Sequence, residues 1–155
     1  DEGFEIHTFQ SPIEAINKTK DLMPDLVITD YKMPEMDGIT MMKETHKIDK
    51  NIPFIFLSAY LTKESMQEAL KYGIFHFLDK PIIENILVHS VKNAISKRKS
   101  LDLAYKAINH ILYHYEELTK YLEENNKDIL ANDLKQNVAN LIGQKMLIKD
   151  LMKKP

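Results

Sequence analysis

The stretch DLVITDYKMPEMDG, residues 25–38, places a carboxylate directly behind a run of apolar and β-branched residues. Leu26 to Thr29 form that run, and Asp30 follows it. Apolar runs without clean alternation are typical of strands that are covered on both faces, as in parallel sheets. Asp37-Gly38 is turn chemistry that leads into the next helix. The stretch therefore predicts a buried strand, a loop and a helix, with Asp30 at the carboxyl end of the strand.

Strand and helix patterns alternate along the first half of the chain with short connections. The expected strands are residues 4–9, 25–29, 52–59 and 74–81, and the expected helices are residues 12–22, 38–48 and 62–73. Ser11 and Glu14 have the spacing of a capping box at the start of the first helix. This alternation predicts βαβ units, and hence an α/β fold with a doubly wound parallel sheet.

From about residue 82 the pattern changes to helix alone. An apolar stripe recurs in steps of four and three, which is the spacing of a coiled-coil seam. The residues of this predicted seam are Ala104, Ile108, Ile111, Tyr115, Leu118 and Leu122. A polar break at residues 123–128 precedes a second amphipathic helix. We therefore expect two domains, residues 1–97 with the sheet and residues 98–155 as a long helical hairpin or coiled coil.

The composition is that of an ordinary globular protein. The chain is 44% hydrophobic and 28% charged, has a formal net charge of −2 and contains no cysteine. Residues 101–155 contain eight lysines and eight acidic residues, so no basic stripe for nucleic acid is present. No apolar run approaches the ~20 residues that span a bilayer, and the N-terminus lacks the order of a signal peptide. These features predict a soluble cytoplasmic protein that binds neither membranes nor nucleic acid.

Three of the expected strands end in a polar side chain that could take part in catalysis. These are the carboxylate of Asp30, the hydroxyl of Ser58 and the ammonium of Lys80. Each alone is ordinary where a strand emerges, but ligands of open parallel sheets bind beyond the carboxyl ends of the strands. Together they suit phosphoryl transfer to a carboxylate, with Asp30 as nucleophile, Ser58 as hydrogen-bond donor and Lys80 as charge partner. Such transfer usually needs Mg²⁺.

The segments DYKMPEMDG, LSA and LDKP, with their separations, resemble the receiver domain of bacterial response regulators of the chemotaxis-regulator kind. The resemblance covers roughly residues 1–97 and implies a flavodoxin-like fold. It implies that Asp30 accepts phosphate from a histidine kinase or phosphotransfer protein, with Ser58 and Lys80 in the roles above. It also implies that the backbone carbonyl of Lys32 joins Asp30 as a Mg²⁺ ligand, that Phe77 is the switch aromatic, and that Pro81 follows a cis peptide bond.

The family pattern begins earlier than residue 1. DEGFE resembles the end of the family's first helix, so about 30 residues, with a strand that lies between the second and third strands, are expected to precede it. Asp1 and Glu2 are not the acidic pair that supplies most of the Mg²⁺ site in the family. The chain is then a fragment of a longer polypeptide, takes that strand from another chain, or closes its sheet differently. Without the pair, weak or absent Mg²⁺ binding and poor phosphorylation are expected.

The expected function is a phosphorylation switch that alters how the helical extension forms a homodimer or docks to a partner. No enzymatic activity is expected beyond self-phosphorylation and slow self-dephosphorylation. The alternative is a pseudo-receiver, a constitutive interaction module that takes no phosphate. A haloacid-dehalogenase-like enzyme also uses an Asp at a strand end, but it places a second Asp two residues later, where this chain has Lys32.

His110 and His114 stand four residues apart on one helical face. This spacing can bind a metal, although no third ligand is evident, and an exposed His on a helix bundle is also typical of phosphotransfer domains. The surrounding residues match neither motif, and we expect surface or seam histidines.

Overall fold

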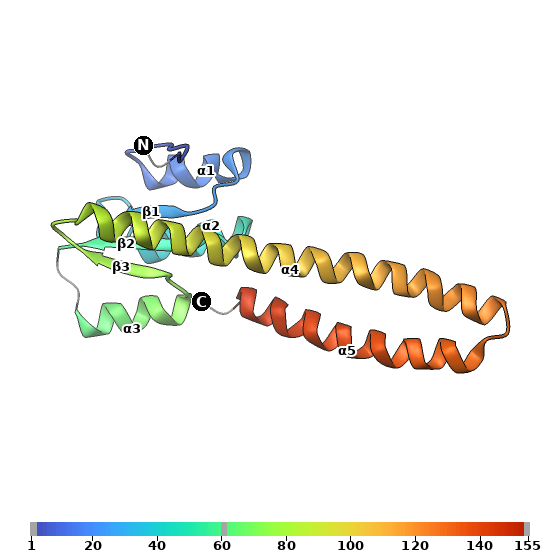
Figure 1. Ribbon diagram of the computed structural model, residues 1–155. Helices are drawn as coiled ribbons and strands as arrows, with labels where there is room; N and C mark the ends of the chain where they lie inside the picture. Colours follow the sequence, from blue (N-terminus) through green and yellow to red (C-terminus); the bar gives the residue numbers. More distant parts are fainter. Residues whose placement is uncertain (1–2, 60–61, 154–155) are drawn as a thin grey trace. The chain divides into compact units, whose positions relative to one another are not determined.

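A computed structural model describes residues 3–59 and 62–153. The chain divides into two compact units, residues 1–95 and residues 96–154, and helix α4 runs from the first into the second (Figure 1). In chain order the elements are α1 (Pro12–Leu22), β1 (Val27–Asp30), α2 (Gly38–Ile48), β2 (Phe54–Ser58), α3 (Lys63–Tyr72), β3 (His76–Asp79), α4 (Glu84–Glu124) and α5 (Asp128–Lys153). No helix in the described ranges is long and apolar enough to cross a membrane.

The three strands form one parallel sheet in the order β1-β2-β3. In the register of the sheet, Asp30 lies opposite Leu57, and Ser58 lies opposite Asp79. All three carboxyl ends therefore reach the same edge. The α/β fold with a parallel sheet, and the strand–helix alternation that predicted it, are confirmed.

The two faces of the sheet are covered by different helices, as a doubly wound fold requires. Phe54 and Phe56 of β2 face one core cluster, together with residues of α2 and α3 such as Met42 and Ala69. The intervening residues of β2 face the other way, where Ile55 packs with residues of β3 and of the first turns of α4. The cluster around Ile55 consists of Ile55, Leu78 and Val91, with Leu26, Leu57, Phe75, Ile82, Leu87 and Ile95 around them. Burial on both faces of β2 explains why its sequence does not alternate.

The helices of the first unit begin and end as predicted, with one correction. Asp37 caps α2 by accepting a hydrogen bond from the Thr40 amide at 2.6 Å, and Gly73 ends α3 with a φ of 95°. The capping box predicted for α1 is wrong. Ser11 occupies the N-cap position without a side-chain cap hydrogen bond, because its hydroxyl donates to the Glu35 carboxylate at 2.8 Å. A hydrogen bond to a charged acceptor is stronger than one to a neutral acceptor.

The predicted strand at residues 4–9 is also wrong. These residues are exposed and belong to neither a helix nor a strand. A strand is stabilised by hydrogen bonds to a neighbour, and within the described part of the chain β1 pairs with β2 alone. Alternating side chains therefore did not suffice to form a strand here.

In the second unit α5 runs back alongside the later part of α4, which makes the predicted helical hairpin (Figure 1). The turn falls within the predicted break, with Asn126 at a φ of 59°. The Lys135 ammonium contacts the Glu123 carboxylate of the facing helix at 2.6 Å. Lys145 of α5 lies 5.7 Å from the ring centre of Tyr105 of α4.

The seam of this hairpin differs from the predicted seam. Ile111 and Leu118 are 40% and 48% exposed, whereas Leu112 and Thr119 are 7% and 9% exposed. The buried stripe of α4 is thus shifted by one residue from two of the predicted positions. Thr119 tolerates burial because its hydroxyl donates to the Tyr115 carbonyl at 2.7 Å, which satisfies the polar group.

Candidate functional site

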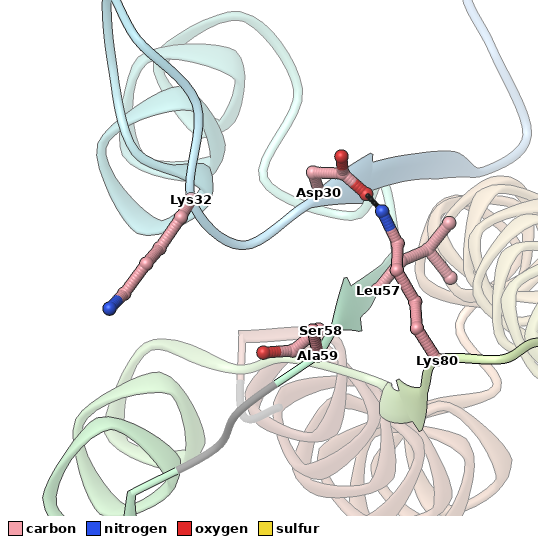
Figure 2. A pocket seen from close by; sticks show the side chains of 6 residues that line it. All are labelled: Asp30, Lys32, Leu57, Ser58, Ala59 and Lys80. Atoms are coloured by element: carbon pink, nitrogen blue, oxygen red, sulfur yellow. Dashed lines mark ion pairs between the residues drawn. The ribbon is translucent and has the colours of Figure 1, made fainter.

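A pocket of about 170 Å³ lies at the carboxyl edge of the sheet (Figure 2). Its lining brings together side chains from the ends of all three strands and from the loop after β1. The lining residues are Asp30, Lys32, Leu57, Ser58, Ala59 and Lys80. The three polar strand ends singled out by the sequence, Asp30, Ser58 and Lys80, therefore share one pocket.

Backbone hydrogen bonds hold these strand ends together. The Tyr31 amide donates to the Leu57 carbonyl at 2.8 Å, and the Lys80 amide donates to the Ser58 carbonyl at 2.8 Å. The Gly38 amide donates to the Tyr31 carbonyl at 2.9 Å, which fixes the loop after Asp30 against the start of α2. These hydrogen bonds tie the ends of β1, β2 and β3, and the start of the loop after β1, to one another at the edge of the sheet.

Lys80 and Asp30 form an ion pair across the sheet edge. The Lys80 Nζ lies 2.6 Å from Oδ1 of Asp30, and the two side chains are 41% and 45% exposed. Figure 2 shows these two side chains meeting, whereas the Ser58 hydroxyl and the Lys32 side chain are directed away from that contact. An exposed pair of this kind stabilises a fold by only ~0–1 kcal/mol. Stabilisation of the fold is therefore a poor explanation for this ion pair.

Phe77 and Pro81 flank the pocket without lining it. The Phe77 ring is half-buried and packs against the core, 5.5 Å from the ring centre of Phe56 and 6.2 Å from that of Tyr31. The Lys80–Pro81 peptide bond is cis. Tyr31 was not singled out from the sequence. Its position directly after Asp30 was the available signal, because a ring there can connect the pocket to the core.

The described pocket does not form a complete Mg²⁺ site. Asp30 is the one carboxylate among its lining residues. Over residues 3–59 and 62–153, no group of three or more His, Cys, Asp or Glu side chains is placed to hold a metal ion. Mg²⁺ demands near-octahedral oxygen coordination, and here the Lys80 ammonium already contacts the carboxylate.

Comparison with known proteins agrees with this fold. The family model for the response regulator receiver domain matches residues 1–92. The chain is 33% identical over 112 residues to YesN, an uncharacterized transcriptional regulatory protein of Bacillus subtilis. This match covers 72% of the chain and 30% of YesN. It is 42% identical over 84 residues to the chemotaxis protein CheY of Thermotoga maritima, covering 54% of this chain and 69% of CheY.

Among solved structures, a response regulator receiver domain from Clostridium thermocellum matches with a TM-score of 0.60 at 31% identity. That match covers 64% of this chain and 81% of the other. The chain spans 30% of the length of YesN and 24% of that of the Escherichia coli regulatory protein AtoC.

The chain belongs to the response regulator receiver domain family. Receiver domains of response regulators act in phosphorylation-dependent signalling within two-component systems. Receiver domains interact with histidine kinases or phosphotransfer proteins, generally bind Mg²⁺ at an acidic pocket, and are regulatory domains rather than enzymes.

Proposed function

We propose that Asp30 is the phosphoryl acceptor of this receiver. A carboxylate oxygen of Asp30 attacks the phosphorus of a phosphohistidine on a histidine kinase or phosphotransfer protein. The phosphorus–nitrogen bond breaks, the imidazole leaves and takes up a proton, and Asp30 becomes an acyl phosphate. The observation that carries this proposal is the Asp30 carboxylate in an open pocket, 2.6 Å from the Lys80 ammonium.

Lys80 and Ser58 are proposed to bind the transferred group. Phosphoryl transfer depends on positioning and charge neutralisation, and the Lys80 ammonium is positioned to exchange the carboxylate for a phosphoryl oxygen. The Ser58 hydroxyl would then donate a hydrogen bond to another phosphoryl oxygen, which requires it to turn toward Asp30. The ring of Phe77 would follow Ser58, and its contacts with Phe56 and Tyr31 link this movement to the core.

Mass spectrometry of the intact chain tests the acceptor. After incubation with acetyl phosphate, with and without MgCl₂, the wild-type chain should gain the mass of one phosphoryl group. Asp30→Asn should gain none, and Asp79→Asn, which removes a neighbouring exposed carboxylate at the end of β3, should behave as wild type. Equal labelling of wild type and Asp30→Asn would remove Asp30 from the proposal.

Lys80→Ala separates a functional role from a structural one. Because the ion pair is exposed, the substitution should change the free energy of unfolding by less than ~1 kcal/mol. The acyl phosphate should nevertheless form more slowly or fail to produce a downstream change. Unaltered labelling and response would exclude Lys80 as the phosphate partner.

We propose further that the domain from residue 98 onward is the output element of a receiver that occupies residues 1–97. Phosphorylation of Asp30 would change homodimerisation or partner docking through this helical extension, since α4 is continuous from one unit to the other. Sedimentation velocity of the phosphorylated chain should show a shifted oligomer distribution that Asp30→Asn lacks. Identical distributions would contradict this output.

The second candidate function is a pseudo-receiver that serves as a constitutive interaction module. The single carboxylate that lines the described pocket favours it. Absence of any acyl phosphate on Asp30 with either a small phosphodonor or a phosphorylated histidine kinase, together with an unchanged association state, would select this candidate.

A further inference from the structure

His110 and His114 lie one turn apart on the exposed face of α4. Their Nε2 atoms are 3.3 Å apart, and their rings meet edge to face with centres separated by 4.5 Å. Both residues are exposed, while the seam that faces α5 runs through Leu112 and Tyr115. The contact is therefore not a by-product of packing between the two helices of the hairpin.

A carboxylate lies against the far side of one of these rings. The Oε2 of Glu117 is 3.6 Å from Nδ1 of His114. Its other oxygen, Oε1, accepts a hydrogen bond from the Tyr113 hydroxyl at 2.9 Å. That hydrogen bond, and then the negative charge of Glu117, raise the pKa of Tyr113. A carboxylate beside Nδ1 favours the proton on that nitrogen, which leaves a lone pair on Nε2, the nitrogen that faces His110.

We propose that His110 and His114 chelate a divalent transition-metal ion such as Zn²⁺ through their Nε2 atoms, with Glu117 as a positioning residue. Zinc–nitrogen bonds are about 2.0–2.1 Å, and in a tetrahedral site two such nitrogens lie roughly 3.3–3.4 Å apart. The observed separation is 3.3 Å. A carboxylate behind a ligating histidine is the usual outer partner of zinc-bound imidazole. For both lone pairs to face the ion, the tautomer of His110 has to change and at least one ring has to rotate, because the rings now meet edge to face.

The ligand type sets the class of metal. Imidazole nitrogen suits zinc, copper and nickel, whereas magnesium and calcium prefer oxygen. No third His, Cys, Asp or Glu completes the set among the residues that the structure describes. The remaining coordination positions are therefore open to water or to a ligand from outside the chain. The site is independent of the phosphoryl chemistry, because none of these residues lines the Asp30 pocket.

Isothermal titration of the full chain with ZnCl₂ tests the site, with MgCl₂ as the negative control. Wild type should bind one zinc ion, and His110→Ala and His114→Ala should each bind at least about tenfold more weakly, because one of two protein ligands is lost. His89→Ala, which removes an exposed histidine elsewhere on α4, should bind as wild type.

A matched variant distinguishes chelation from binding to isolated surface histidines. The double substitution His114→Gln and Gln136→His keeps the composition, the charge and all six histidines, but it separates the pair. It should lose the site, and an affinity within twofold of wild type would overturn the proposal. So would zinc affinity that both alanine variants retain.

Glu117→Gln tests the positioning role, because the substitution should change the tautomer of His114, which the loss of a purely structural contact would not change. NMR of the imidazole nitrogens should find the proton of His114 on Nδ1 in the wild type and partly on Nε2 in the variant. Zinc affinity should fall by about tenfold, within the range for outer partners of metal ligands. Unchanged tautomer and affinity would exclude Glu117.

Discussion

Replacing Gly38 with alanine should loosen the edge of the sheet that carries the candidate site. Gly38 is the first residue of α2, and a Cβ there would lie 2.9 Å from the Asp30 carbonyl oxygen and 3.1 Å from Cε1 of Phe56. It would also lie 3.3 Å from Cα of Tyr31, whereas ordinary van der Waals contact begins near 3.4 Å. Two of these neighbours are backbone atoms and cannot rotate aside.

Two opposing terms set the magnitude of this change. Overpacking typically costs about 1–3 kcal/mol, and replacing glycine by alanine in a helix contributes at most about 1 kcal/mol in the other direction. Because the backbone neighbours cannot rotate aside, we expect an overpacking cost of about 2–3 kcal/mol. The net loss is then about 1–2 kcal/mol, which makes the locally unfolded form roughly five- to thirtyfold more populated. The loss should be local to β1, β2 and the start of α2.

Hydrogen exchange measured on peptides separates the two units of the chain. In Gly38→Ala, amides of residues 27–31 and 54–58 should exchange roughly five- to thirtyfold faster under conditions where exchange reports the open population. Gly143→Ala is the matched control, since its Cβ would meet nothing within 4 Å in exposed α5, and it should slow exchange in α5. Stabilisation by both substitutions would refute the close approach of α2 to Asp30.

The remaining predictions concern packing and charge. Thr45→Val should raise the free energy of unfolding by about 1 kcal/mol, because the buried Thr45 hydroxyl has no hydrogen-bond partner among the residues that the structure describes. Urea denaturation measures this change, and a loss of stability would contradict it. Leu112→Ala should lower the free energy of unfolding by about 2–5 kcal/mol, and Ile111→Ala should lower it by well under half as much. Equal losses of stability in urea denaturation would contradict the observed seam. Glu117→Gln should lower the pKa of Tyr113, which ultraviolet titration against wild type detects; an unchanged titration would show that Glu117 does not raise it.

The sheet, the helices and the strand-end residues followed from the sequence because burial and periodicity act locally. Leu26 to Thr29 could be recognised as a strand, and the shared edge of parallel strands then brought Asp30, Ser58 and Lys80 together. The sequence did not show that residues 4–9 form no strand, because strand formation depends on which neighbouring strand is available to pair with them.

The errors in the helices have a similar cause. Thr119 lies in the seam because its hydroxyl bonds to its own helix, so a polar residue replaced an apolar one in the pattern. The Ser11 side chain does not cap α1, because its hydroxyl donates a hydrogen bond to Glu35, which is distant in sequence. The spacing of His110 and His114 was visible in the sequence, but the 3.3 Å approach and the placement of Glu117 depend on side-chain rotamers.

Chemical trapping of the acyl phosphate tests the central claim most directly. The chain is treated with a phosphodonor, reduced with borohydride and digested, and the peptides are sequenced by mass spectrometry. Since borohydride converts an acyl phosphate to an alcohol, the account predicts homoserine at position 30, dependent on the phosphodonor and absent from Asp30→Asn. Homoserine at another position, or none with a phosphorylated histidine kinase as donor, would contradict the assignment of Asp30 as the phosphoryl acceptor.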